Sequence, residues 1–352
     1  MLATCLTTAA LLTSRIPHPI CCASGLTSLL ETAEQYDAFL LDQFGVIHDG
    51  KKAYEGSVEA VMALQKMGKK IVIISNSSRR RSDTVARLRA MGFGPCEGDA
   101  DDNGDAPAIG VVTSGDLCFE GLSASADRND APFDGLGIRC LVFGNGDDDE
   151  DYVRDCGKVA SPVSQADFLL ARGLFTILGA GPDLLRDPFA EYSAEREEAL
   201  LREALARRPG GLPLLVANPD LLRPDGNDSP MPGQLAARYR EMGGEDIRLV
   251  GKPHALIYDA CRRKLEAAGL GGQGSEARIA AVGDSLHHDV LGAARNGVDS
   301  IFICSGVHCN ELGVPQAKAV PPEAGKLEAL LAGFAEESGG VKPTHTLAAF
   351  RL

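Results

Sequence analysis

The sequence has few positive charges for its length. Its 352 residues contain 35 Lys and Arg against 49 Asp and Glu, which gives a formal net charge of -14. A nucleic-acid-binding protein generally needs a concentrated basic surface, so this balance argues against a nucleic-acid partner. The hydrophobic content of 44% is ample for a globular core, and the length suggests two domains or one domain with a large insertion.

The sequence has no C-x-x-C pair and no long apolar run beyond its N-terminal segment. The ten cysteines are scattered and include no C-x-x-C pair, so neither a disulfide framework nor a zinc site is indicated. No run beyond the N-terminal segment is apolar over the length that a membrane-spanning helix needs. The sequence therefore gives no reason to expect a membrane partner.

Acidic residues are absent from the N-terminal segment, residues 1–30, and Glu31 is the first of them. This segment has a single Arg and many Ser, Thr, Ala and Leu, which is typical of an organellar transit peptide. A secretory signal fits less well, because Arg15 and Pro17 interrupt the apolar stretch and no positive charge precedes it. A disordered N-terminus fits equally well. We therefore expect a plastid or a mitochondrion if the segment is a transit peptide, and the cytoplasm otherwise.

The regular part of the chain begins with a carboxylate at the end of an apolar run. Residues 38–41 are apolar, stop on Asp42 and lead at once into a glycine-containing loop, as expected for a buried strand with an acid at its tip. A carboxylate there is costly to bury unless a cation or hydrogen-bond donors meet it. A helix from Ser57 and a strand over 70–74 complete a βαβ unit, which ends on Ser75.

Two more polar residues follow predicted strands later in the chain, and a third begins the helix after the second of them. The middle, 81–244, mixes short strands with helices and Pro/Gly-rich loops and predicts an inserted α/β domain. The βα alternation resumes over 245–352, where Lys252 and Asp284 follow strands and Asp289 begins the next helix. Parallel strands with helical crossovers bind ligands at their carboxyl edge. Acids, a hydroxyl and a Lys at one edge suit a divalent cation together with a phosphoryl group.

The order of these residues resembles the haloacid dehalogenase-like (HAD) hydrolase superfamily, and within it the class IIA phosphatases similar to NagD and the p-nitrophenyl phosphatases. The resemblance runs from Asp37 to about Leu312. It implies a Rossmann-like parallel-sheet core built from residues 31–80 and 245–352, with an inserted α/β cap domain over 81–244. Four motifs carry it: Asp42-Gln43-Phe44-Gly45-Val46, Ile74-Ser75-Asn76, Gly251-Lys252-Pro253, and Gly283-Asp284-Ser285 through Asp289.

The resemblance also implies a role for each motif. Asp42 would attack phosphorus and form an aspartyl-phosphate, which would make this chain a phosphatase of a small phosphorylated metabolite admitted under the cap. A homo-oligomer formed through the cap is compatible with it. The implied Mg²⁺ ligands are Asp42, Asp284, Asp289 and the backbone carbonyl of Phe44, and the implied phosphate ligands are Ser75, Asn76 and Lys252, of which Lys252 also assists catalysis.

One residue departs from the pattern. Most phosphatases of this superfamily have a second Asp two positions after the first, where it protonates the leaving group, and this chain has Phe44 there. General acid-base catalysis contributes roughly 10²- to 10⁴-fold, and a phenyl ring cannot supply it. His48 and Asp49 are the nearest titratable alternatives in the sequence.

Phe44 leaves three hypotheses open. The leading one is a Mg²⁺-dependent phosphatase. The second is a metal-independent dehalogenase-like hydrolase, although a halide site has no use for the acids Asp284 and Asp289. The third is a catalytically weak protein that binds a phosphorylated ligand.

Overall fold

The computed structural model describes residues 26–98, 108–124, 130–146, 148–179, 189–221, 231–270 and 277–352. The N-terminal segment lies outside these residues except for 26–30, so the transit-peptide prediction stays a prediction. In the described parts of the chain, no helix has the length and apolar character needed to cross a membrane.

The first sheet has six parallel strands in the order β13-β12-β11-β1-β2-β3. From the centre of the sheet, β1, β2 and β3 follow one another toward one edge, and β11, β12 and β13 follow one another toward the other edge. The strand order therefore reverses between β1 and β11. Ligands in open α/β sheets bind at such a reversal, beyond the carboxyl ends of the strands. The predicted Rossmann-like parallel sheet is confirmed. Its strands are β1 (Ala38–Leu41), β2 (Lys70–Ser75), β3 (Gly110–Thr113), β11 (Ile279–Gly283), β12 (Asp299–Ile303) and β13 (His345–Leu347).

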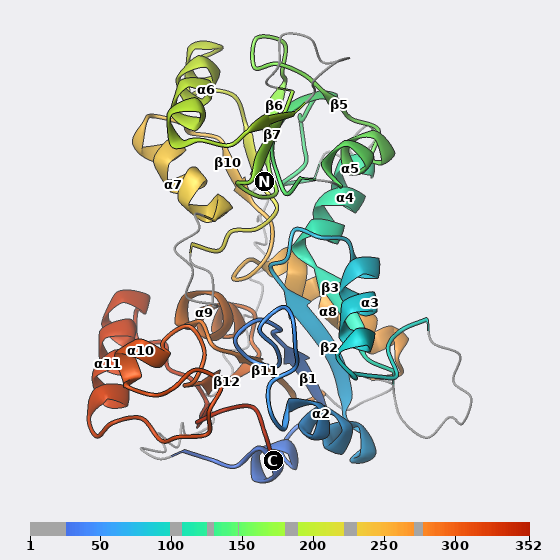
Figure 1. Ribbon diagram of the computed structural model, residues 1–352. Helices are drawn as coiled ribbons and strands as arrows, with labels where there is room; N and C mark the ends of the chain where they lie inside the picture. Colours follow the sequence, from blue (N-terminus) through green and yellow to red (C-terminus); the bar gives the residue numbers. More distant parts are fainter. Residues whose placement is uncertain are drawn as a thin grey trace, which may run out of the picture.

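Helices surround this sheet (Figure 1). Its central strand β1 is buried at all four positions, which explains why it is a continuous apolar run and not an alternating one. The helix α2 turns Ala60, Val61 and Leu64 into the core, and α8 packs on β2 and β3. The helices are α1 (Leu29–Ala33), α2 (Ser57–Lys66), α3 (Arg81–Ala90), α8 (Ala255–Ala267), α9 (Leu291–Arg295), α10 (Cys309–Leu312) and α11 (Lys326–Ser338).

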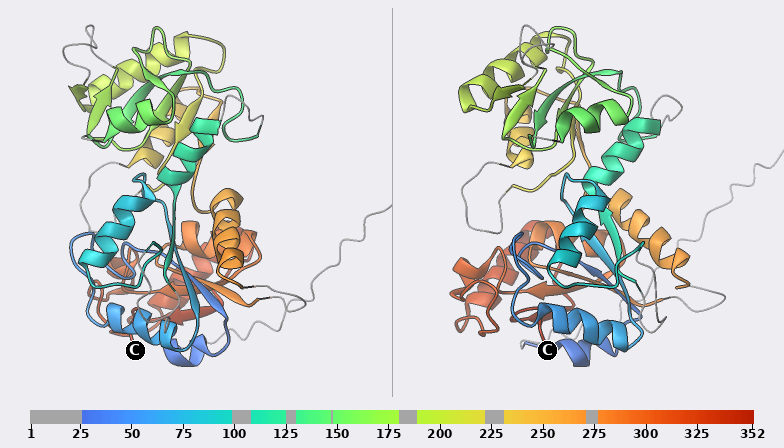
Figure 2. Two further views of the ribbon diagram at one scale, coloured as in Figure 1. Left: turned by 90° about the vertical axis from the view of Figure 1, so that its right-hand side faces the viewer. Right: turned by 45° about the vertical axis from the view of Figure 1, so that its right-hand side comes forward.

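A second sheet lies apart from the first, and together with its helices we call it the cap domain (Figures 1 and 2). Its strand order is β10-β9-β6-β4-β7-β8, with β5 beside β4. Strand β7 pairs in antiparallel fashion with both of its neighbours, β4 and β8. The strands are β4 (Arg139–Gly144), β5 (Val159–Ala160), β6 (Phe168–Ala171), β7 (Thr176–Leu178), β8 (Phe189–Glu191), β9 (Leu214–Val216) and β10 (Ile247–Leu249). The helices are α5 (Asp149–Asp155), α6 (Ala194–Ala206) and α7 (Pro232–Glu241).

The cap domain begins and ends later than the boundaries predicted at 81 and 244. Strand β3 pairs with β2 in the first sheet, so α3 and β3 belong to the core. Strand β10, predicted as the return to the core, pairs with β9 in the cap domain. Both are short strands of three or four residues, and their own sequence carries no signal of which sheet they join, since pairing depends on distant segments.

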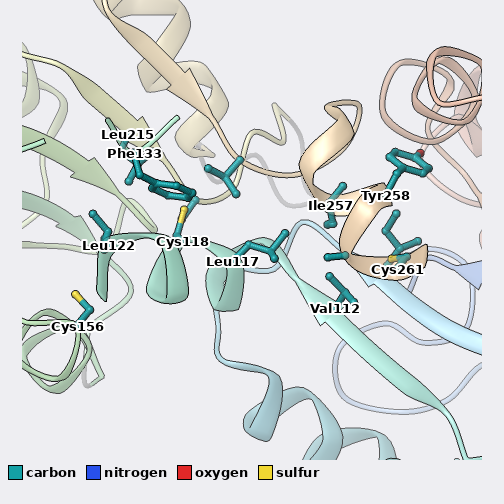
Figure 3. Close-up of a cluster of buried hydrophobic side chains, with 14 of the residues drawn as sticks. Val112, Leu117, Cys118, Leu122, Phe133, Cys156, Leu215, Ile257, Tyr258 and Cys261 are labelled. Carbon is teal, nitrogen blue, oxygen red and sulfur yellow. The ribbon is translucent and has the colours of Figure 1, made fainter. Parts of the chain in front are cut away.

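A helix and an apolar cluster join the two parts. Helix α4 (Ser114–Ala124) leaves the end of β3 and runs toward the cap domain (Figure 2). Around it, Val112 and Ile257 of the core and Leu215 of the cap domain belong to one cluster with Leu117 and Leu122 of the helix (Figure 3). Burying a side chain of this size stabilises by roughly 1.5–3 kcal/mol. The junction is therefore a packed interface.

Candidate active site

The predicted site residues meet in one cavity of about 460 Å³. Asp42 follows β1, Ser75 ends β2 and Asp284 follows β11, so neighbouring strands bring them to the carboxyl edge of the first sheet. Lys252 also lines the cavity, but it follows β10 of the cap domain, which corrects the expectation that it ends a core strand. Asp289 completes the set.

Three acids form the floor of this cavity. Asp42, Asp284 and Asp289 each offer a carboxylate oxygen, and these oxygens lie within 4.8 Å of one another. Backbone amides orient two of them, because Val307 N–H donates to Asp284 Oδ2 at 2.7 Å and Ser285 N–H donates to Asp289 Oδ2 at 3.0 Å. Burial raises the pKa of Asp42 to about 7. Burial and the other two carboxylates raise the pKa of Asp284 well above its ordinary value.

A tight turn places Asp289 in this group. Instead of the regular helix that the sequence predicts from Asp289, a π-helical turn, η1 (Leu286–Val290), follows β11 and precedes α9. The Ser285 hydroxyl accepts a hydrogen bond from His288 N–H at 3.2 Å, which caps the turn. As a result Asp289 folds back toward the end of β11.

One lysine opposes the three acids. Lys252 Nζ lies 2.9 Å from Asp42 Oδ1 and 2.7 Å from Asp289 Oδ1, and the residue is 2% exposed. Burial would lower the pKa of Lys252, but Asp289 and Asp42 raise it above its ordinary value. Asn76 fixes the lysine backbone, since its Oδ1 accepts from Lys252 N–H at 2.7 Å and its Nδ2 donates to Lys252 O at 3.3 Å.

The acid cluster fits a divalent cation. Two buried carboxylates and the half-buried Asp42 face one ammonium group, so a further positive charge would stabilise their ionised forms, and carboxylate oxygens are the ligands that Mg²⁺ prefers. The backbone at Gly45 also leaves room here. A Cβ at Gly45 would lie 1.9 Å from Asp284 Oδ2, and its φ of +80° favours glycine.

Ser75 lies beside this cluster as a hydroxyl at the end of β2. It is 2% exposed, and its Oγ accepts a hydrogen bond from Ser77 N–H at 3.2 Å. The hydroxyl hydrogen is then available to donate toward an oxygen in the cavity.

The cap domain contributes a residue that the sequence interpretation missed. Arg172, directly after β6, lines the cavity although it is only 1% exposed. Its guanidinium pairs with Asp149 at 2.5 Å and Asp148 at 2.7 Å, and it stacks on the Tyr152 ring at 3.7 Å. Its Nη2 also donates to the backbone carbonyl of Ser78 at 3.3 Å, in the loop after β2. The sequence does contain a signal for Arg172, because this residue directly follows an apolar strand, as Asp42 does.

A second contact joins the cap domain to the core at the cavity. Asp220, in the turn after β9, accepts from Asn76 Nδ2 at 2.8 Å and lies 3.2 Å from His288 Nδ1, both through Oδ1. Asn76, predicted to contact phosphate, thus uses its amide to hold Lys252 and Asp220 together. This arrangement makes Asn76 a positioning residue in the structure.

Comparisons with known proteins agree with this architecture. The family model for haloacid dehalogenase-like hydrolases matches residues 39–158, and a second HAD-hydrolase-like model matches residues 249–346. The chain belongs to the haloacid dehalogenase-like hydrolases. Among HAD relatives, human chronophin is 29% identical over 76% of this chain and 81% of its own length. The D-glycerol 3-phosphate phosphatase of Mycobacterium tuberculosis is 26% identical over 78% of this chain and 65% of its own length.

Solved HAD structures have the same two-sheet architecture. A haloacid dehalogenase-like hydrolase from Brucella suis superposes with a TM-score of 0.63 at 25% identity, covering 91% of this chain and 98% of that one. NagD from Escherichia coli superposes with a TM-score of 0.54 at 18% identity, covering 90% of this chain and 98% of that one. The class IIA resemblance inferred from the motifs is confirmed at the level of the fold.

Phe44 occupies the HAD position at which an acid was expected. Its ring lines the cavity and meets the His48 ring edge-on, with centroids 4.8 Å apart. His48 is fully buried: Nδ1 accepts from Gly50 N–H at 3.1 Å, and Nε2 lies 3.3 Å from Gln43 Oε1. Burial lowers the pKa of His48 to about 4, so the ring is neutral at pH 7. His48 therefore holds the loop in shape.

Asp49 is equally unsuited to replace the missing acid. Its Oδ1 accepts from the backbone N–H groups of Lys51 and Lys52, both at 2.8 Å. Slight burial acts in the opposite direction, but these hydrogen bonds lower the pKa of Asp49. A carboxylate that stays ionised at neutral pH cannot donate a proton there.

Proposed function

We propose that this chain is a Mg²⁺-dependent phosphatase that hydrolyses a phosphate monoester of a small metabolite. The observation that carries the proposal is the position of Asp42, at the end of β1 among Asp284 and Asp289, with Lys252 Nζ at 2.9 Å. Membership of the HAD hydrolases supports it, and so does the relative whose name gives glycerol 3-phosphate as substrate.

In the proposed reaction the Asp42 carboxylate attacks phosphorus, the bond to the leaving oxygen breaks, and an aspartyl-phosphate forms. Lys252 and Ser75 hold the phosphoryl oxygens, and the ammonium group of Lys252 reduces the repulsion between two anions. Water then attacks phosphorus and releases phosphate and the Asp42 carboxylate. Asp42, Asp284, Asp289 and the backbone carbonyl of Phe44 would hold Mg²⁺, which would supply further positive charge at the phosphoryl group.

Phe44 supports a second candidate function. With a phenyl ring at 44, a neutral His48 and an ionised Asp49, none of these three residues offers a proton for a leaving alkoxide. The cavity would then bind a phosphorylated ligand and turn it over slowly. The homo-oligomer formed through the cap domain stays a prediction of the family resemblance in either case.

Hydrolysis of p-nitrophenyl phosphate separates these functions. We expect turnover with Mg²⁺, its loss in EDTA, and its loss in the Asp42→Asn variant. Asp259→Asn is the matched control, because Asp259 is an exposed acid on α8 outside the cavity. Wild-type turnover no greater than that of Asp42→Asn would reject the phosphatase. Binding of phosphate esters without turnover would favour the second candidate, and halide release from a haloacid in EDTA would favour a dehalogenase.

A further inference from the structure

The basic residues of the cavity wall fall into two groups. Two of them are neutralised by the chain itself: Lys252 pairs with two acids of the floor, and Arg172 pairs with Asp148 and Asp149. Arg79, Arg87 and the exposed Lys51 have no carboxylate at ion-pair distance among the residues that the structure describes. The basic residues of the wall are Lys51, Arg79, Arg87, Arg172 and Lys252.

Arg79 and Arg87 lie on the same part of the wall. Arg79 is exposed and directly follows Ser78 in the loop after β2, and Arg87 is half-buried two turns into α3. Burial and the charge of Arg79 both lower the pKa of Arg87, while Asp83 acts weakly in the other direction. Two guanidinium groups that repel each other in a partly desolvated wall are stabilised when an anion binds between them.

The acids of the wall are already occupied. The carboxylates of the floor face Lys252 and the proposed cation site. Asp49 uses its Oδ1 for two backbone amides, and Asp220 uses its Oδ1 for Asn76 and His288. None of these carboxylates lies at ion-pair distance from Arg79 or Arg87, so the positive charge of the Arg pair is open to a ligand.

We propose that the substrate carries a second anionic group, a carboxylate or a second phosphate, which Arg79 and Arg87 bind while the phosphoryl group meets Asp42. This inference rests on the proposed phosphatase function and narrows its substrate class. The planar guanidinium matches either anion through two parallel hydrogen bonds. A phosphate ester with an uncharged tail leaves the pair without a partner, and it is the poorer substrate.

Matched esters test the inference. 3-Phosphoglycerate and glycerol 3-phosphate differ only in a carboxylate against a hydroxymethyl group. Fructose 1,6-bisphosphate and fructose 6-phosphate differ in a second phosphate. In at least one pair we expect the anionic member to have the higher kcat/KM, by ~10-fold or more, as for a charged hydrogen bond. The pair that shows the preference identifies which anion the site takes.

Variants assign that preference to the two arginines. Arg79→Gln and Arg87→Gln should each lower the kcat/KM ratio within the preferred pair by ~10-fold. Arg89→Gln is the control, because it removes the same charge from the same helix outside the cavity wall, and it should leave the ratio unchanged. Ratios near one in both pairs, or a preference that neither cavity variant reduces, would overturn the inference.

A binding measurement separates this inference from the proposed function. If no ester is turned over, the phosphatase proposal fails, and calorimetric Kd values of the wild-type protein with Mg²⁺ decide the inference instead. We then expect the anionic member of one pair to bind at least ~10-fold more tightly, and Arg87→Gln to abolish that difference. Equal Kd values within both pairs would reject the second anionic group.

Discussion

Replacement of Phe44 by Asp tests whether the missing acid limits catalysis. Phe44 lines the cavity two residues after Asp42, so a shorter carboxyl side chain there lies at the same wall. A proton donor at this position should accelerate the loss of a poor leaving group by roughly 10²- to 10⁴-fold. p-Nitrophenolate leaves without a proton, so its rate should rise much less.

The same change should cost some stability. The Phe44 ring contacts the His48 ring edge-on at 4.8 Å, an arrangement worth about 0.5–1.5 kcal/mol. The ring is half-buried, so losing its apolar burial should add about 1 kcal/mol, less than for a fully buried ring. We expect the free energy of unfolding to fall by about 2 kcal/mol, which urea unfolding followed by circular dichroism can measure.

The assay compares kcat/KM for an alkyl phosphate and for p-nitrophenyl phosphate in wild type, Phe44→Asp and Phe44→Asn. The Asn variant has nearly the same shape as the Asp variant but cannot act as an acid. The ratio of alkyl to p-nitrophenyl rates should rise only with Asp. An unchanged or lower ratio in Phe44→Asp, or an equal rise in Phe44→Asn, would show that proton donation does not limit this site.

Three further changes test the surroundings of the site. Asp284→Asn should raise the Mg²⁺ concentration for half-maximal activity more than ~10-fold, because even residues that only hydrogen-bond to a metal ligand change metal affinity by that factor. An unchanged Mg²⁺ midpoint would show that Asp284 does not bind the cation. Because the pKa of His48 is lowered to about 4, the unfolded chain binds a proton that the folded chain does not as pH falls from 6.5 to about 4. At about 1.36 kcal/mol per pH unit, the free energy of unfolding of the wild type should fall by roughly 3 kcal/mol over that window. The His48→Gln variant should not show this loss, which urea unfolding midpoints at each pH can check. Arg172→Met should destabilise by about 3–5 kcal/mol because Asp149 is left buried without its partner, and adding Asp149→Asn should restore most of the loss; a double variant as unstable as the single one would contradict this.

The sequence was sufficient to predict the core because its signals are local. A short apolar run that stops on a polar residue marks a buried parallel strand, and the carboxyl ends of such strands share one edge. Asp42, Ser75 and Asp284 follow this rule and meet in the structure. Asp289 was also placed correctly, although through a π-helical turn that its sequence does not reveal.

Features that depend on distant partners could not be predicted in this way. Strand β13 has three residues, and only its pairing with β12 makes it a strand, so the C-terminal tail gave no sign of it. The predicted domain boundaries differ from the observed ones for the same reason, because β3 and β10 join their sheets through pairing with distant strands. His48 and Asp49 were reasonable proton donors until the structure showed that their polar atoms are bonded to their own loop. In the sequence, Arg79 and Arg87 look like ordinary surface charges, and only the structure shows that both line the cavity.

The packed junction around α4 has a consequence for how such proteins diversify. The helix shares one apolar cluster with strands of both sheets, and Leu117, Cys118 and Leu122 lie inside it (Figure 3). A foreign cap inserted after β3 without α4 would leave Val112 and Ile257 facing water. A cap domain moved to another core therefore has to include this helix. During evolution, substitutions in the helix and in both sheets have to preserve the packing of this shared cluster.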